Sequence, residues 1–148
     1  MYHYTECGLD NVYLKNGFIE ADTDYGKAYS VVGMEDLHKV IGESIIAETA
    51  ALNGQEIRFL LKELDLSQKH LANILGITDQ TVARWEKNER TIPRASDLVL
   101  RTYFSESVSG DSKIANLIQQ LTELDRKQTM QKLIFEESHN GWHTENAA

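Results

Sequence analysis

A second cysteine is missing from this sequence, and its absence excludes two kinds of site. Cys7 is the one cysteine in 148 residues, so the chain can form no internal disulfide and no zinc site of paired C-x-x-C thiolates. A reduced, intracellular setting is therefore expected. A chain of this length, either one ordinary domain or a small domain with appendages, can bury a core without such cross-links.

Long apolar runs and enzyme motifs are missing as well. No stretch approaches the roughly 20 apolar residues that a membrane span needs, and residues 1–6 lack the basic and then apolar order of a signal peptide. The sequence has no P-loop, no Gly-x-Ser-x-Gly motif and no cluster of metal ligands. We expect a soluble, cytoplasmic protein that is not an enzyme and that uses no metal and no cofactor.

Positive charge is scarce overall, which argues at first against a nucleic-acid partner. The formal net charge is -8, whereas phosphate binding draws its affinity from Lys and Arg. The charge is unevenly distributed: residues 1–53 carry 3 basic and 9 acidic side chains, residues 54–104 carry 8 and 7, and residues 105–148 carry 4 and 7. Five of the six arginines lie in the middle segment, where a planar guanidinium can serve phosphate and guanine.

Residues 1–52 are predicted to form a small α+β module. The dipeptide Asn16-Gly17 separates two apolar runs, which is a strong hairpin signal. A second turn is expected near residues 22–24, with a strand through Val32 after it. A helix over residues 34–50 should then cover one face of this antiparallel sheet. Its apolar residues recur at helical spacing: Leu37, Val40, Ile41 and Ile45.

Residues 53–106 carry the start and stop signals of several short helices. Asn53 followed by Glu56 predicts a capping box, Ser67 can cap a second helix that ends at Gly76, and Thr78 can cap a third. The inward residues expected for these helices are Ile57, Leu60, Leu61, Leu64, Leu71, Ala72, Leu75, Val82 and Trp85. Pro93 suits the first turn of a fourth helix, for which Ala95, Leu98, Val99 and Thr102 are the expected buried residues. Two short helices joined by a glycine turn can place the second helix in the DNA major groove.

The run of residues 67–86, SQKHLANILGITDQTVARWE, resembles the consensus of the XRE (phage repressor-like) helix-turn-helix family. The central segment that the resemblance covers is roughly a third of the chain. It implies that Gln68 contacts phosphate and that Trp85 and Glu86 belong to core and scaffold. It also implies that the third helix reads base edges through Thr78, Asp79, Gln80, Thr81 and Arg84.

The chemistry of these positions agrees with that role. Gln80 can pair with adenine, Arg84 with guanine, and the Thr81 methyl group can contact thymine, each good pair giving roughly 1 to 3 kcal/mol of discrimination. Lys69, Arg90 and Arg94 are further phosphate candidates. Two alternatives stay open. Asp79 can simply complement the helix dipole, and the same surface can serve protein contact because fold does not fix function.

The first residues also resemble a second family. Residues 4–14, YTECGLDNVYL, and the small sheet before a repressor-like domain are similar to the zinc-finger/helix-turn-helix antitoxins of the MqsA type. Those proteins bind zinc through two cysteine pairs, so zinc does not carry over to a chain with Cys7 alone. His3 and Cys7 lie four residues apart, as do His139 and His143. We assign the first pair a structural role and the second pair to a mobile tail.

After a linker at residues 107–110, the chain is predicted to end in a helical extension. One apolar stripe holds Ile114, Leu117, Ile118, Leu121 and Leu124, and a second short helix is expected around Met130, Leu133 and Ile134. The stripe needs a cover, which is either the same chain's helix-turn-helix domain or a second copy in a dimer.

The sequence thus predicts a mainly α protein in three parts. These are a small antiparallel β module with a helix over residues 1–52, a repressor-like five-helix domain over 53–106, and a C-terminal helical extension and tail over 107–148. The expected function is sequence-specific regulation of transcription, as an autoregulatory repressor that binds a pseudo-palindromic operator as a homodimer. The alternative is an antitoxin of a type II pair, whose acidic N-terminal module neutralises a basic protein toxin while the chain represses its own operon.

Overall fold

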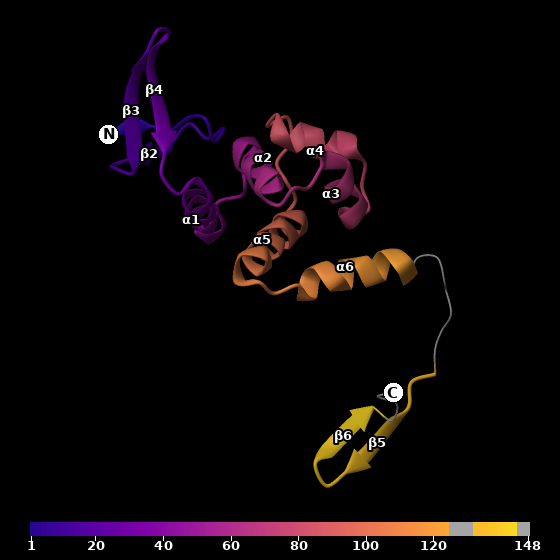
Figure 1. Cartoon of the computed structure of the whole chain (residues 1–148). Helices are drawn as coiled ribbons and strands as arrows, with labels where there is room; N and C mark the ends of the chain where they lie inside the picture. Colours follow the sequence, from indigo (N-terminus) through magenta and orange to yellow (C-terminus); the bar gives the residue numbers. More distant parts are fainter. Residues whose placement is uncertain (125–131, 145–148) are drawn as a thin grey trace.

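The computed structural model describes residues 1–124 and 132–144, with side chains for 1–120 and 132–144. Mainly helical, as predicted, it has short strand pairs near both ends (Figure 1). The strands are β1 (Tyr2–His3), β2 (Tyr13–Leu14), β3 (Phe18–Thr23), β4 (Gly26–Val31), β5 (Phe135–Ser138) and β6 (Gly141–Thr144). The helices are α1 (Met34–Ala47), α2 (Gly54–Glu63), α3 (Gln68–Leu75), α4 (Asp79–Glu86), α5 (Arg94–Ser109) and α6 (Lys113–Leu124).

The N-terminal strands pair differently from the prediction. β2 pairs antiparallel with β1, and β3 pairs antiparallel with β4, so the hairpin predicted at Asn16-Gly17 does not form. The second turn, predicted near residues 22–24, does form and closes the β3–β4 hairpin: the Thr23 hydroxyl donates to the Gly26 carbonyl at 2.6 Å and accepts from the Tyr25 amide at 3.2 Å. A turn motif marks where the chain can reverse direction, but strand partners are chosen by contacts made elsewhere, such as the ring of Tyr2 stacked on Tyr29 of β4.

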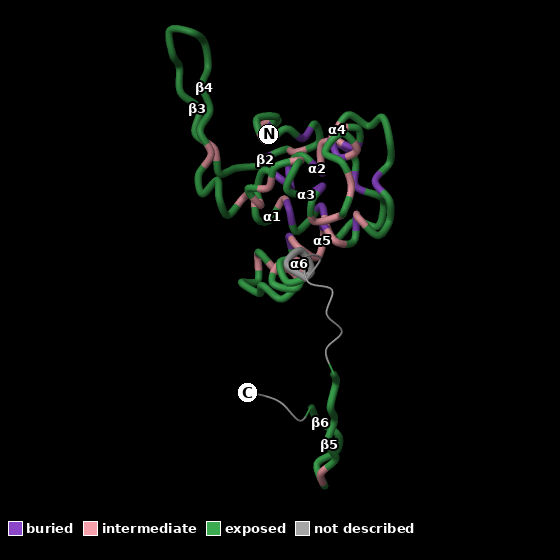
Figure 2. The backbone as a smooth tube through the Cα atoms, turned by 90° about the vertical axis from the view of Figure 1, so that its right-hand side faces the viewer, coloured by how far each residue is buried: buried purple, intermediate pink, exposed green. Residues whose placement is uncertain are grey.

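Helix α1 does not cover the sheet as predicted, and it ends at Ala47 rather than near residue 50. It packs against α2 and α5, because Gly42 allows a close approach: a Cβ there would lie 2.1 Å from the Phe104 ring. The β3–β4 hairpin therefore projects from the body with its residues almost all exposed (Figure 2). Residues 53–109, all of which are described, hold four helices, α2 to α5, rather than the five predicted for residues 53–106. A fifth helix, α1, packs against α2 and α5 from outside this range.

One hydrophobic core joins these helices. The inward faces predicted for the first three helices of the central segment are confirmed at Ile57, Leu60, Leu71, Val82 and Trp85, which are 0 to 3% exposed. Leu64 and Leu75 are partly buried against them. The remaining core residues include Leu9 from the N-terminal loop and Ile45 from α1, together with Leu52, Phe59, Leu61, Ala72, Ile92, Leu100 and Phe104.

The buried face predicted for α5 is wrong. Ala95 is exposed, Leu98 is 64% exposed, and Val99 and Thr102 are half-buried, whereas Leu100 and Phe104 lie in the core. Asp97 is buried on that inner side because it has polar partners there. Its carboxylate accepts the Leu52 amide at 2.9 Å and pairs with Arg101.

Arg101 ties α5 to the chain that links α1 and α2. Its guanidinium donates to the Ile46 carbonyl at 3.2 Å, to the Glu48 carbonyl, and to the Ala50 carbonyl at 2.6 Å. These carbonyls follow the last turn of α1 or lie within it, where a helix leaves acceptors without internal partners. Arg101 is therefore committed to holding the fold.

The C-terminal part differs from the predicted pair of helices. The linker predicted at residues 107–110 is mostly helical, because α5 continues to Ser109. After a turn at Gly110, α6 packs against α5, and its Ile114 amide donates to the Glu106 carboxylate at 2.7 Å. Leu133 and Ile134 precede the β5–β6 hairpin rather than lying in a second helix; Met130 lies outside the described residues, as do the side chains of Leu121 and Leu124. His139 and His143, assigned to a mobile tail, lie in the turn and in β6.

Candidate nucleic-acid interface

A short glycine turn sets α3 and α4 against each other. The Ser67 hydroxyl caps α3 by accepting the His70 amide at 3.0 Å, and α3 ends at Gly76, which has a left-handed φ of 69°. The Ile77 amide then returns to the Ala72 carbonyl at 3.0 Å. Because a side chain at position 76 would be strained in this conformation, the glycine lets α4 start directly after α3. This is the predicted helix-turn-helix arrangement.

Helix α4 has one buried face and one open face. Val82 and Trp85 are 0% and 3% exposed, so the inner face is fully packed. Gln80 and Arg84 are exposed, and residues four apart lie on the same side of a helix. Asp79 and Thr78 are also exposed at the start of α4, while Thr81 is half-buried. All five predicted base-reading residues thus lie at the N-terminal end or on the open side of α4.

Thr78 starts α4 but does not cap it as predicted. Its hydroxyl lies 3.1 Å from the hydroxyl of Thr81, and its side chain makes no capping hydrogen bond to an amide of α4. The two hydroxyls therefore orient each other at the entrance of the helix.

Glu86 joins the helices on either side of the turn. The Gln68 amide donates to its carboxylate at 2.6 Å, and the Arg58 guanidinium of α2 approaches the same carboxylate at 3.9 Å. The side chain of Glu86 is 10% exposed, and Trp85 beside it lies in the core, so both are scaffold residues as predicted. Gln68, half-buried at the start of α3, uses part of its amide for this contact.

Sequence reasoning missed two residues that support the end of α4. A Cβ at Gly54 would lie 2.1 Å from the Glu86 carbonyl oxygen and 2.8 Å from that of Trp85, so α2 touches the backbone of α4. Asn88 takes a left-handed φ of 60°, and its side chain accepts the Gly54 amide at 2.8 Å. Asn is one of the few residues that visit this conformation readily, which is the signal by which the sequence could have indicated Asn88.

Basic side chains surround the open face of α4. Lys69, Arg84, Arg90 and Arg94 are all exposed, as the prediction of phosphate and base contacts requires. Lys87, which sequence reasoning missed, is exposed at the end of α4, one turn beyond Arg84. Asp79 and Glu89 are the exposed acidic residues of the same stretch, so five exposed cations stand against two exposed acids.

The residues considered for metal binding make other contacts. The His3 ring lies 2.6 Å from the Asp10 carbonyl oxygen and stacks on Tyr13, and the Cys7 thiol donates to the Tyr4 carbonyl. Within residues 1–124 and 132–144, no group of three or more His, Cys, Asp or Glu side chains is placed to hold a metal ion. In the same part of the chain, no helix has the length and apolar character needed to span a membrane.

A comparison with protein families agrees with this geometry. A helix-turn-helix family model matches residues 57–100, which run from α2 into α5. The matched segment is an XRE-type helix-turn-helix domain. Such domains bind DNA in regulatory proteins, so the chain carries a DNA-binding regulatory domain. Searches of curated proteins and of solved structures gave no significant match, and the resemblance of residues 4–14 to antitoxins stays a prediction.

Proposed function

We propose that this protein is an autoregulatory repressor that binds a pseudo-palindromic operator as a homodimer. The helix-turn-helix domain of residues 53–106 reads DNA, and the flanking parts, 1–52 and 107–148, control its assembly and its partners. The base-reading residues are Thr78, Asp79, Gln80, Thr81 and Arg84, and the phosphate-binding residues are Gln68, Lys69, Arg90 and Arg94. The observation that carries the proposal is the open face of α4, opposite a face that is fully buried.

The spacing on α4 fits base contacts in the major groove. Gln80 and Arg84 are four residues apart, which is a rise of about 6 Å along a helix. Base pairs follow one another every 3.4 Å or so, so the two side chains reach bases roughly two steps apart. Their donors match adenine and guanine, respectively. A single helix of this length reads only a few bases, which favours a two-fold operator with two half-sites.

The charge of the chain favours the same arrangement. Non-specific affinity comes from cations near phosphate, and residues 54–104 carry 8 basic and 7 acidic side chains while the whole chain is at -8. One domain alone therefore binds random DNA weakly. Two domains joined in a dimer combine their contacts, so the dimer binds most tightly to DNA whose two half-sites have the correct spacing.

The test is a gel-shift titration of the DNA upstream of the protein's own gene at several salt concentrations, with random duplex as competitor. We expect the upstream DNA to be preferred, and Arg84→Ala to reduce that preference by roughly 5- to 150-fold, the equivalent of one bidentate base contact. Lys27→Ala is the matched control, because Lys27 is exposed in the β3–β4 hairpin and pairs with Glu20 there. An unchanged preference in Arg84→Ala would show that α4 is not the reading helix, and no preference in the wild type would exclude autoregulation.

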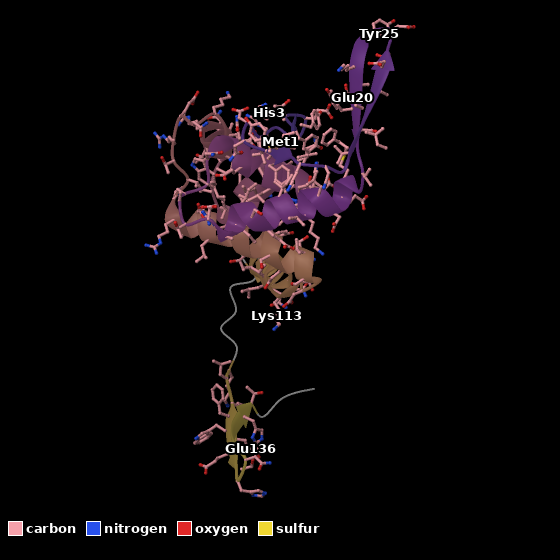
Figure 3. The ribbon with its side chains drawn as sticks, turned by 90° about the vertical axis from the view of Figure 1, so that its left-hand side faces the viewer. Met1, His3, Glu20, Tyr25, Lys113 and Glu136 are labelled. Carbon is pink, nitrogen blue, oxygen red and sulfur yellow. The ribbon has the colours of Figure 1, made fainter. Side chains whose placement is uncertain are left out.

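A second candidate function, an antitoxin of a type II pair, is favoured by the β3–β4 hairpin. Glu20, Asp22 and Asp24 are exposed on it with Lys27 as its basic residue, and Tyr25 stands at its tip (Figure 3). An exposed acidic hairpin suits a basic protein partner. Co-expression with a small basic protein encoded beside this gene would then give a stable complex that Glu20→Lys with Asp22→Lys disrupts. Without such a complex, the chain acts as a solitary repressor.

A further inference from the structure

We propose that α6 is the surface on which two copies of this chain associate, as an antiparallel pair of helices related by a two-fold axis. The inference deepens the proposed homodimer by assigning its interface, and it rests on that part of the proposed function. It is independent of which residues read DNA.

The first support is an apolar side chain left open in the middle of α6. Leu117 is 54% exposed, although α6 packs against α5 and is anchored there by the hydrogen bond from the Ile114 amide to Glu106. Ile114 and Ala115 beside it are half-buried. An exposed leucine in this position, with the apolar Ile114 one turn away, is what a helix presents to a second helix.

The second support is charge, which favours a copy of the chain as the occupant. Residues 113–124 contain one basic residue, Lys113 in the first turn, and one acidic residue, Glu123 in the last. An antiparallel pair brings position 113 of one copy near position 123 of the other, and opposes the two helix dipoles favourably. The acids just before α6 are already engaged, since Asp111 accepts the Lys113 amide at 3.1 Å and Glu106 accepts that of Ile114.

The β3–β4 hairpin, which also exposes apolar side chains, is less suited to a second copy. Ile19 is 59% exposed on the β3–β4 hairpin, but this hairpin also carries Glu20, Asp22 and Asp24. Two such hairpins would bring like charges together, and like charges directly opposite are destabilising. In a chain of net charge -8, the nearly neutral α6 is a surface on which two copies can approach with less repulsion than on this hairpin.

The third support is position. α5 lies between α4 and α6, and both views of the fold place α6 on the side of α5 away from α4 (Figures 1 and 2). Pairing through α6 therefore leaves the open face of α4 free in each copy. A dimer built in this way can offer two reading helices to one operator.

The test is sedimentation equilibrium of the full chain without DNA. We expect a monomer–dimer equilibrium with a dissociation constant on the order of micromolar, because one helix face buries less than the roughly 800 Å² per partner of a standard interface. Leu117→Asp should raise this constant roughly 30-fold or more, since a carboxylate would enter the centre of the contact twice. Ile19→Asp is the matched control of nearly equal exposure and should leave the dimer intact. A monomeric wild type, or loss of the dimer in Ile19→Asp but not in Leu117→Asp, would overturn the proposal.

The antiparallel arrangement has its own check. Lys113→Glu and Glu123→Lys, each alone, should raise the dissociation constant by roughly three- to tenfold, and the two together should restore it. Failure of the double variant to restore the dimer would exclude the antiparallel pairing. These measurements are made without DNA, so their outcome does not depend on the repressor proposal. Arg84→Ala should change base preference and stay dimeric. Leu117→Asp should become monomeric while its reading helix is unchanged.

Discussion

The side-chain amide of Gln68 donates a 2.6 Å hydrogen bond to the carboxylate of Glu86. The contact joins the first residue of α3 to the last residue of α4, and so fixes the angle between the two helices at their ends farthest from the turn. A hydrogen bond to a carboxylate is shorter and stronger than one between neutral groups. Arg58 adds less, because its own side chain is 60% exposed and its distance to the carboxylate is 3.9 Å.

Replacing Glu86 should destabilise the fold. In Glu86→Ala, Gln68 keeps its half-buried position but loses its acceptor, which costs about 1 to 3 kcal/mol and lowers the melting temperature by several degrees in a chain of this size. Glu86→Gln retains an acceptor and should lose less. Glu89→Ala removes an exposed acid three residues away and should leave thermal denaturation unchanged. Equal melting temperatures for Glu86→Ala and Glu89→Ala would contradict this role.

Gly54→Ala offers a case in which helix propensity and packing disagree. Alanine is favoured over glycine in a helix interior by roughly 1 kcal/mol, and at Gly54, the first residue of α2, by less, so propensity alone predicts a small stabilisation. The new Cβ would lie 2.1 Å from the Glu86 carbonyl oxygen, which is backbone and cannot rotate away. We expect a net loss of roughly 1 to 3 kcal/mol in the free energy of unfolding, measured by chemical denaturation. A variant as stable as the wild type would mean that α2 and α4 are not in this contact.

The helix boundaries of the central segment could be predicted because the atoms that set them are close in sequence. Asn53 and Glu56 form the predicted capping box through bonds that span three residues, and Ser67 caps α3 in the same way. The open face of α4 follows from the same local logic, since a period of 3.6 residues separates Val82 and Trp85 from Gln80 and Arg84. None of these three features involves a distant partner.

The errors arose where a distant residue decides the outcome. The buried face of α5 was misplaced because other residues were expected to be buried, whereas Asp97 is the buried polar residue: it accepts an amide 45 residues away and pairs with Arg101. The prediction of the strand pairing failed for a related reason. The Asn16-Gly17 turn predicts that β2 pairs with β3, but β2 pairs with β1, at the very start of the chain. Gly54 and Gln68 gain their roles only when α2, α3 and α4 are assembled.

Tyr4 predicts a loss of stability at alkaline pH. Its side chain is 1% exposed and its hydroxyl lies 2.8 Å from the His38 ring, and burial raises its pKa above the usual 10.0. The folded state then resists losing this proton, so the stabilisation is complete below pH 10 and falls as the pH rises through the raised pKa. The difference in unfolding free energy between wild type and Tyr4→Phe should therefore shrink above pH 10. Tyr25→Phe, at the exposed hairpin tip, is the control, and a difference independent of pH would refute the assignment.

Replacing the two arginines of α5 by alanine should affect the stability of the fold in different ways. Arg101 holds Asp97 and three carbonyl oxygens, so Arg101→Ala leaves a buried carboxylate without its cation and should cost about 3 to 5 kcal/mol of stability. Arg101→Lys should rescue little of it, because an ammonium cannot span the same fork of acceptors. Arg94 is exposed at the start of the same helix, and Arg94→Ala should leave the melting temperature unchanged.

The effect of Arg94→Ala should show in DNA binding instead. A phosphate contact is insensitive to base sequence, so affinity should fall by the same factor for the operator and for random duplex. The slope of log K against log salt concentration should also decrease by about 0.9 for each protomer bound, the number of counterions that one contact releases. Fluorescence anisotropy on both duplexes at several salt concentrations measures the two quantities together. A loss confined to the operator, with the salt slope retained, would assign Arg94 to base reading rather than to phosphate.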